Sequence, residues 1–186
     1  MRIVSGLALF AIITCIVGFA PAKESDRAAP APKAVPSAGS PAAQAFEKFK
    51  LLAGGAWEAR KADDQVCRAT YQIIANGSCV METFEFVGQP EHTMVTMYHM
   101  NGPDLLLTHY CMAGNQPRMQ ATELAADGST ALFTYKDGTN MASRDEGHMD
   151  KASFKFVDAD TFTSQWTWYE DGKESWMEEF TYVRKP

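Results

Sequence analysis

The sequence lacks an excess of positive charge. Its 186 residues hold 17 Lys and Arg against 23 Asp and Glu, which gives a formal net charge of −6 at pH 7. Acidic chains whose basic residues are scattered have no electrostatic footprint for nucleic acid, and they are repelled by anionic lipid. We therefore expect no nucleic-acid partner and no membrane contact beyond export.

The chain also lacks an apolar run long enough to cross a membrane as a helix. Its longest run, from Leu7 to Phe19, is shorter than the ~20 residues that such a helix needs. Arg2 precedes the run, and Ala20-Pro21-Ala22 follows it with the small-x-small pattern typical of signal-peptide cleavage. We expect residues 1–22 to be a signal peptide, cleaved near Ala22, and the mature protein to be periplasmic or secreted.

Cysteine is scarce, with four in the chain. Cys15 falls in the expected signal peptide, and a lipid anchor there is not expected because Thr14 is a poor residue before a modified cysteine. Cys67, Cys79 and Cys111 remain in the mature chain. Because their number is odd, at least one thiol is unpaired in the monomer.

Residues 23–44 have almost no large apolar side chain and hold four prolines among Ala and Ser. Such a segment buries too little surface to offset the entropy lost on ordering. We expect a disordered Ala/Pro-rich linker there, and one domain over residues 45–186.

Helical periodicity is confined to one short stretch. The sequence "FEKFKLLAGG" (46–55) sets Phe46, Phe49 and Leu52 on one face and ends in two glycines. After it come short runs rich in Val, Thr, Tyr, Phe and Trp, separated by turn signals. The runs predict strands at 56–61, 66–74, 79–87, 92–100, 104–111, 118–124, 130–136, 151–157, 161–169 and 174–183. About ten antiparallel strands predict an all-β fold, a single closed antiparallel meander barrel with a short N-terminal helix, because closure removes exposed strand edges.

Strand register assigns side chains to the two faces of the barrel wall. A two-residue turn at Asn76-Gly77 pairs Ile74 with Cys79 and Tyr71 with Glu82. Apart from Tyr71 and Glu82, the face that they share is apolar, so we assign it to the interior: Cys67, Ala69, Tyr71, Ile73, Val80, Glu82, Phe84 and Phe86. Cys67 and Cys79 then lie on opposite faces and are not expected to be bonded.

The later strands give further interior rows. His109 and Cys111 share a face with Met94, Thr96, Tyr98, Leu105 and Leu107, and we favour this face as the interior although both are apolar. The last two strands give inner rows of Phe162, Ser164, Trp166 and Trp168, and of Trp176, Glu178, Phe180 and Tyr182. Residues 137–150 form the longest irregular segment, either a lid with His148 and Met149 turned inward or, as we favour, a plain surface loop.

A family resemblance enters at Gly55-Ala56-Trp57. A Gly-x-Trp after an opening helix, followed by antiparallel strands, resembles the lipocalin-like or calycin barrels. The chain from about 46 to 183 looks more closely like a group of uncharacterised exported bacterial proteins with this start, a strand like "VMETFEF" and a segment like "THYC…GNQPRM". The resemblance implies a barrel and export, with no established activity. Nitrobindin-type haem barrels share the ten strands and the Gly-x-Trp, but continue into a longer glycine-rich signature where this chain reads "GGAWEARK".

Polar residues on the predicted inner faces suggest a ligand site. A lone buried carboxylate is costly, so Glu82 must find a partner or stay protonated. We expect a small, mostly apolar ligand inside the barrel, with its polar end held by side chains from several strands. The candidate ligand-binding residues are Tyr71, Glu82, Thr96, Tyr98, His109, Arg118 and Trp166.

Three alternatives remain open. In the first alternative, the polar cluster binds no ligand and is a structural network inside a packed interaction module. An enzyme would use His109, Cys111 and Glu82, although side chains two apart on one strand are parallel, with Cα atoms roughly 6.5 Å apart. A metal on His109 and Cys111 would need a third ligand from Glu82, His99 or His148. Zinc or haem is thus a lesser possibility, and we expect no cofactor.

Overall fold

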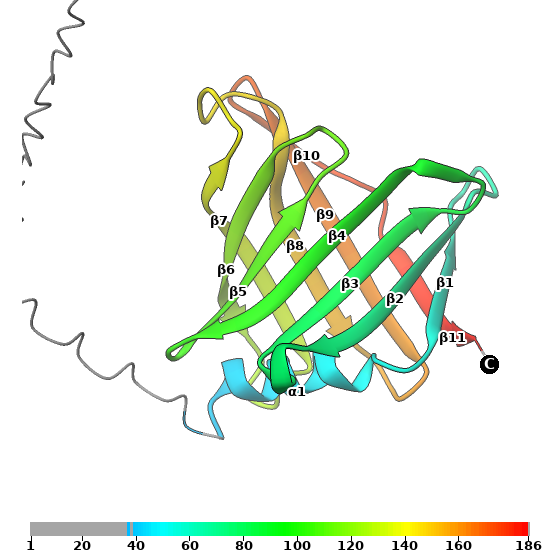
Figure 1. The fold of residues 1–186 in the computed structure, drawn as a ribbon, viewed down its shortest axis with the longest axis vertical. Coiled ribbons are helices and arrows are strands. Elements are labelled where there is room, and N and C mark those ends of the chain that lie inside the picture. Colours follow the sequence, from blue (N-terminus) through cyan, green and yellow to red (C-terminus); the bar gives the residue numbers. More distant parts are fainter. Residues whose placement is uncertain (1–36, 38, 186) are drawn as a thin grey trace, which may run out of the picture. The chain divides into compact units, whose positions relative to one another are not determined.

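The residues that the structure describes form a barrel wall of eleven strands, with one α-helix at one end of the barrel (Figure 1). The computed structural model describes residue 37 and residues 39–185. The expected signal peptide, Cys15 and most of the expected linker lie outside these residues. The helix is α1 (Pro41–Leu51), and the strands are β1 (Ala56–Arg60), β2 (Val66–Ile74), β3 (Cys79–Phe86), β4 (Gln89–Asn101), β5 (Asp104–Tyr110), β6 (Gln116–Leu124), β7 (Thr130–Thr139), β8 (His148–Phe156), β9 (Thr161–Glu170), β10 (Lys173–Trp176) and β11 (Phe180–Lys185).

The wall closes on itself with ten strand positions. Each strand from β1 to β9 pairs antiparallel with the next, and β11 returns to pair with β1. One edge of β9 pairs with both last strands, β11 on its first half and β10 on its second. The expected strand at 174–183 is therefore real but interrupted at residues 177–179. The all-β, closed antiparallel meander predicted from the sequence is confirmed.

The hairpin at Asn76-Gly77 has the predicted register. Ile74 pairs with Cys79 and Tyr71 with Glu82. Asn76 and Gly77 have φ of 54° and 84°, and Ser78 N donates to Ala75 O at 3.2 Å. Two central residues at positive φ make a type I′ turn, whose twist matches the strands.

The helix begins earlier than expected. Ser40 caps it by accepting from Ala43 N at 3.2 Å, and Pro41 occupies the first turn. The expectation of a disordered linker through residue 44 is therefore wrong for its last residues, because Ser-Pro here starts a helix. Ala45 is fully buried, and a Cβ at Gly128, in the β6–β7 turn, would overlap its backbone.

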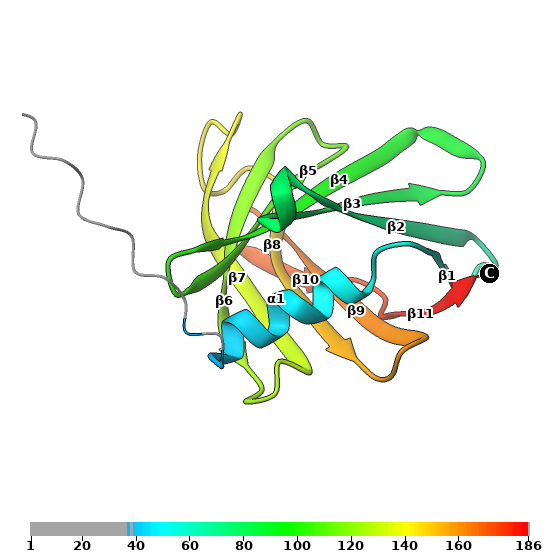
Figure 2. The ribbon, with the colours of Figure 1, turned by 60° about the horizontal axis from the view of Figure 1, so that its bottom comes forward.

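The helix closes one end of the barrel, as Figure 2 shows. Phe49 is fully buried there. Its ring stacks on Tyr98 with centroids 4.2 Å apart, and meets Phe154 and Phe156 edge-on at 5.1 and 5.0 Å. Such aromatic contacts add to the free energy of apolar burial, so α1 is part of the core.

Trp57 and Arg184 hold the C-terminal end of the helix. Trp57 Nε1 donates to Leu52 O at 2.9 Å, and the Arg184 guanidinium donates to Leu51 O at 3.0 Å. Arg184 also lies over the Trp57 ring, 4.2 Å from its centroid. The Trp of the Gly-x-Trp motif thus joins the helix to the first and last strands.

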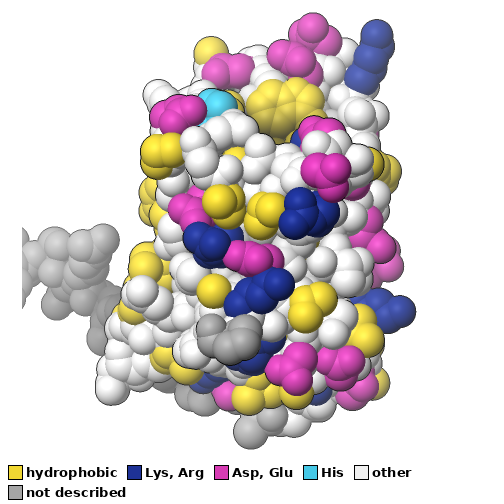
Figure 3. Space-filling view, turned by 90° about the vertical axis from the view of Figure 1, so that its right-hand side faces the viewer, with side chains coloured by type: hydrophobic (Ala, Val, Ile, Leu, Met, Phe, Trp, Pro, Cys, Tyr) yellow, Lys and Arg dark blue, Asp and Glu magenta, His cyan; other side chains and the backbone are white. Residues whose placement is uncertain are grey.

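The outer wall beside β1 and β11 is a mosaic of opposite charges (Figure 3). Arg68 bridges Glu58 at 2.8 Å and Glu85 at 3.0 Å, and Lys185 adds a second contact to Glu58 at 3.5 Å.

Within the described residues, no helix is long and apolar enough to cross a membrane.

Replacing Phe49 with alanine should destabilise the fold by about 3 kcal/mol or more, because it empties a fully packed aromatic site. Leu51→Ala, two residues further along the helix but 68% exposed, should change stability by less than about 0.5 kcal/mol. Urea unfolding followed by tryptophan fluorescence measures both. An equal loss of unfolding free energy in the two variants would contradict a helix that packs into the end of the barrel through Phe49.

Candidate functional site

A cavity of about 440 Å³ lies inside the barrel wall. It extends from mid-barrel toward the end opposite α1, where Trp176 and Met177 are 47% and 41% exposed at its mouth. Aromatic and methionine side chains dominate its lining, which is formed by Lys61, Glu82, Phe84, Phe86, Met94, Thr96, His109, Met149, Trp166, Trp168, Ser175, Trp176, Met177, Glu178, Phe180 and Tyr182. The barrel is thus packed at the helix end and hollow at the other.

A row of polar side chains crosses the inner face where the packed and hollow halves meet. Tyr71, Glu82, Thr96 and His109 are successive cross-strand neighbours on β2, β3, β4 and β5. Each is at most 6% exposed. Because side chains alternate between faces along a strand, one register places all four on the inner face.

Glu82 is the buried acid of this row. Tyr98 donates a short hydrogen bond of 2.5 Å to its Oε2. Burial raises the pKa of Glu82, and the hydroxyls of Tyr98, Tyr71 and Thr96 only partly oppose that shift. Tyr71 lies on the opposite strand, but its own buried hydroxyl has no hydrogen-bond partner of good geometry among the described residues.

His109 is a neutral imidazole facing the cavity. Its Nδ1 lies 3.0 Å from Thr96 Oγ1, whereas its buried Nε2 has no hydrogen-bond partner within the described part of the chain. Burial lowers the pKa of His109 to about 4. Trp166 lies beside it, with ring centroids 4.8 Å apart.

Six of the seven candidate ligand-binding residues lie inside the barrel. Glu82, Thr96, His109 and Trp166 line the cavity. Tyr71 and Tyr98 are buried next to Glu82 but do not line the cavity.

Arg118 does not belong to the cluster, and its expected role there is wrong. Its neighbours Pro117 and Met119 turn inward, so alternation turns Arg118 outward. On the outer face it forms a two-pronged ion pair with Asp137, its cross-strand partner, at 2.5 and 2.6 Å.

The inner row expected of the last strand is half correct. Phe180 and Tyr182 are buried, but Trp176 and Glu178 are exposed where the strand is interrupted. Met177 N donates to Trp166 O at 2.8 Å in this break. Trp176 and Glu178 consequently line the mouth of the cavity instead of its interior.

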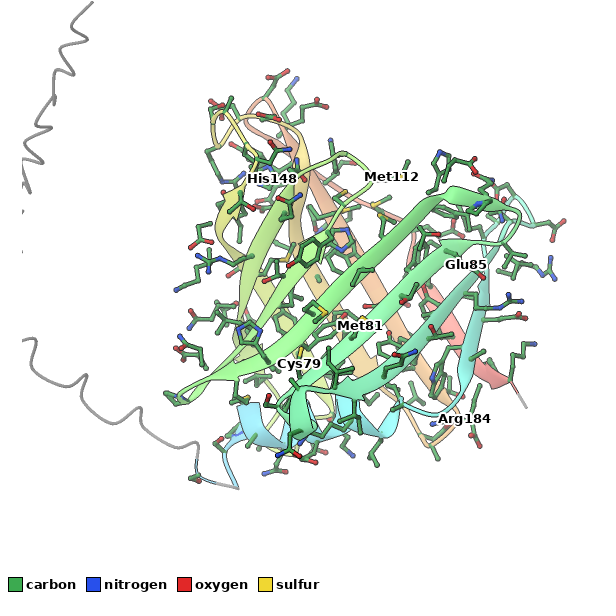
Figure 4. The ribbon with its side chains drawn as sticks, viewed as in Figure 1. Cys79, Met81, Glu85, Met112, His148 and Arg184 are labelled. Atoms are coloured by element: carbon green, nitrogen blue, oxygen red, sulfur yellow. The ribbon has the colours of Figure 1, made fainter. Side chains whose placement is uncertain are left out.

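The three described cysteines are free thiols, so Cys67 and Cys79 are not bonded to each other, as expected. Cys79 lies along the outer face of β3 with Met81 and Glu85 (Figure 4). Burial raises the pKa of Cys111, which disfavours the thiolate that a nucleophile or a zinc ligand requires.

The residues present do not fit a zinc site. Among the described residues, no group of three or more His, Cys, Asp or Glu side chains is placed to hold a metal ion. Of the third ligands considered from the sequence, Glu82 is inside, but His99 falls on the outer-facing series of β4. His148 is engaged elsewhere.

A second polar cluster surrounds His148 near the start of β8 (Figure 4). The Arg144 guanidinium donates to His148 Nε2 at 2.7 Å and to the buried Asp150 at 2.5 Å. It also stacks between the rings of Tyr135 and Tyr169, 4.4 and 3.7 Å from their centroids. These contacts brace the β7–β8 connection, so we assign the cluster a structural role.

The irregular segment expected at 137–150 is shorter than predicted, because strand residues form both of its ends. β7 extends to Thr139 and β8 begins at His148, which leaves 140–147 as the loop. Met149 turns inward and lines the cavity, whereas His148 pairs with Tyr169 and is buried in the Arg144 cluster. No residue of 140–147 lines it, so this loop is not a lid over it.

Several lining residues were not named from the sequence as site residues. Trp168 and Phe84 have the same parity as Trp166 and Glu82, so alternation alone could have added them. Lys61 and Met177 reach the mouth from irregular segments, where no periodic signal exists.

Comparison with known proteins adds little beyond the fold. No protein-family model matches the chain, and no curated protein matches it. Among solved structures, it is similar to the crystal structure of a protein of unknown function from the DUF3598 family of Nostoc punctiforme, at 14% sequence identity and a TM-score of 0.48. That likeness covers 74% of this chain and 49% of the other, about half of its length. The ten-position closed antiparallel barrel itself fits the calycin-like fold that the sequence suggested.

Glu82 should make the protein less stable as pH rises. Because its folded pKa is raised above 4.5, the folded state binds the proton more tightly, and stability is lost between the unfolded and the folded pKa. Glu82→Gln, which mimics the protonated acid, should flatten this decline in urea unfolding across a pH series. The outer-face variant Glu85→Gln should leave it in place; a decline that survives in Glu82→Gln would contradict a buried neutral acid.

His109 should act in the opposite sense. Its folded pKa of about 4 lies below the ordinary 6.5. The folded state therefore favours the neutral imidazole, and stability is lost as the pH falls from 6.5 to about 4. His109→Gln should reduce the acid-side loss of unfolding free energy by about 3 kcal/mol. The same titration on His92→Gln serves as the control, since His92 does not line the cavity. An unchanged acid limb in His109→Gln would contradict the buried neutral imidazole.

Proposed function

We propose that the protein binds a small, mostly apolar ligand inside its barrel. The observation that carries this proposal is the cavity of about 440 Å³, open at the mouth and floored by Glu82, Thr96 and His109. Ligand pockets of roughly 300–1,000 Å³ are usually lined by apolar and aromatic side chains with a few fixed polar groups. This cavity has that composition.

A binding role explains the cavity better than a packed interaction module does. A packed barrel gains stability from filling its interior, and each unfilled volume costs dispersion and hydrophobic free energy. Here large side chains such as Trp166 and Trp168 border open space instead of filling it. A ligand that enters would recover these contacts.

Haem is the second candidate, and one observation favours it. Nε2 of His109 is a buried imidazole nitrogen beside the cavity without a hydrogen-bond partner in the described residues, which suits an axial ligand to iron. A Soret band in the purified protein that disappears in His109→Gln would support haem, and its absence after growth with added haem would count against it.

Export belongs to the same proposal. The pattern at residues 1–22 and the resemblance to exported bacterial proteins support a periplasmic or secreted carrier. Cell fractionation and the intact mass of the mature chain test it. A mature chain that begins after Ala22 would agree with cleavage, whereas a lipid mass on Cys15 would indicate anchoring instead.

The ligand site can be tested with N-phenylnaphthylamine, a neutral dye that fluoresces in apolar surroundings. Met94 and Met97 lie on opposite faces of β4, and only Met94 lines the cavity. Met94→Trp should fill the space and weaken dye binding by about tenfold or more, a loss of ~1.4 kcal/mol, whereas Met97→Trp should bind as the unmodified protein does. Native mass spectrometry should also detect a co-purified small molecule. Saturable dye binding that is equal in both variants would place the site elsewhere, and no saturable binding would contradict the function.

A further inference from the structure

The floor of the cavity contains an acid but no cationic side chain. Of the charged side chains that line the cavity, Lys61 and Glu178 stand at the mouth, and only Glu82 belongs to the floor. Lys61 is already paired with Asp63 at 3.3 Å, and Glu178 accepts from Ala62 N at 2.9 Å. A ligand carboxylate at the floor would therefore face Glu82 with no compensating cation.

The hydrogen bonds already present leave an acceptor on Glu82. Tyr98 donates to Oε2, and no hydrogen bond in the described part of the chain occupies Oε1. An ionised carboxylate has about four lone-pair sites on its two oxygens, so it can accept from Tyr98, from Thr96 and from a ligand at the same time.

His109 offers a second acceptor through Thr96. The Thr96 hydroxyl stands between Glu82 and His109, its cross-strand neighbours on the two sides. It has one hydrogen. If it gives that hydrogen toward Glu82, its oxygen accepts Nδ1–H from His109 across 3.0 Å. Nε2 then carries no hydrogen, and its lone pair has no partner among the described residues.

We propose that the ligand is a primary amine with an apolar body, whose ammonium group lies against Glu82 and His109. This inference rests on the proposed ligand-binding function. An ammonium group has three donors and no acceptor, which complements two free acceptors. Aromatic faces such as those of Trp166 and Trp168 also attract a cation, and they pack against the hydrocarbon.

Binding of this ligand should release a proton at any pH at which free Glu82 is protonated. Before binding, burial raises the pKa of Glu82. The ammonium stabilises the carboxylate, so the carboxyl proton passes to solvent and a buried ion pair forms. Affinity should therefore rise with pH through the range in which free Glu82 titrates.

The other groups around Glu82 do not share this titration. The phenols of Tyr71, Tyr98 and Tyr182 approach it from β2, β4 and β11, and burial raises the pKa of each well above its ordinary value. His109 on β5 has its pKa lowered to about 4. Lys61 and Glu178 lie at the mouth of the cavity. Because Glu178 is a second carboxylate, it needs a variant of its own.

The experiment compares octylamine, octanol and octanoate, which share a chain length and differ in the head group. Isothermal titration calorimetry of the full mature protein, over a pH series and in two buffers of different ionisation enthalpy, measures affinity and proton release. Octylamine should bind about tenfold or more tightly than octanol, as expected for hydrogen bonds to a charged group. It should release a proton, and octanoate should bind weakest.

Variants separate the floor from the mouth. Glu82→Gln should lose about tenfold in octylamine affinity, together with proton release, and keep its octanol affinity. Glu85→Gln on the outer face should bind octylamine as the unmodified protein does, and Glu178→Gln tests the alternative position at the mouth. If Glu82→Gln fails to fold, the pH dependence of octylamine affinity and the proton release of the unmodified protein still test whether the amine binds at Glu82.

The outcomes distinguish this inference from the function beneath it. Octanol or octanoate binding as tightly as octylamine, or octylamine binding without proton release, would overturn the amine and leave a carrier of another ligand. Loss of octylamine binding only in Glu178→Gln would place the amine at the mouth and overturn the floor site. If none of the three ligands binds and the neutral dye does not bind either, the carrier function itself fails.

Discussion

The stack of Phe49 on Tyr98 connects the closed end of the barrel to its candidate site. Phe49 reaches in from the helix, and the Tyr98 ring lies 4.2 Å from it, centroid to centroid. The hydroxyl of the same tyrosine donates to Glu82 at 2.5 Å. One residue therefore belongs to the aromatic core on one side and fixes the buried acid on the other. The packed half of the barrel thereby sets where the hollow half begins.

That arrangement keeps ionisable groups in a setting that disfavours their charge. Burial pushes the pKa of Glu82 upward and that of His109 downward, so both lean toward their neutral forms, with Thr96 between them. Neutral groups are the less costly state in a site bounded by Trp and Phe side chains. A ligand that brings its own charge changes this balance, which is why the head group of the ligand is the informative variable.

The sequence predicts the inner face where a turn fixes the register, and fails where the chain departs from regular pairing. Asn76-Gly77 allows only a narrow choice of hairpin, so the Tyr71–Glu82 pair follows from local chemistry. Arg118 was misassigned as a polar partner in the barrel, because the buried Pro117 and Met119 on either side of it require that its side chain point outward. The interruption at 177–179 carries no clear sequence signal, because it depends on how β9 divides its edge between two strands.

The sequence by itself determined the class of fold, the helix that precedes it and the inward direction of Glu82, Thr96 and His109. All of these depend on local turns and on a two-residue period. Only the tertiary structure decided that the interior is filled at one end and open at the other, that Arg118 pairs with Asp137 outside, and that Trp176 and Glu178 stand at the mouth. The reason is physical: the pattern of a strand tells which way a side chain points, whereas the space in front of it depends on strands and a helix distant in the chain.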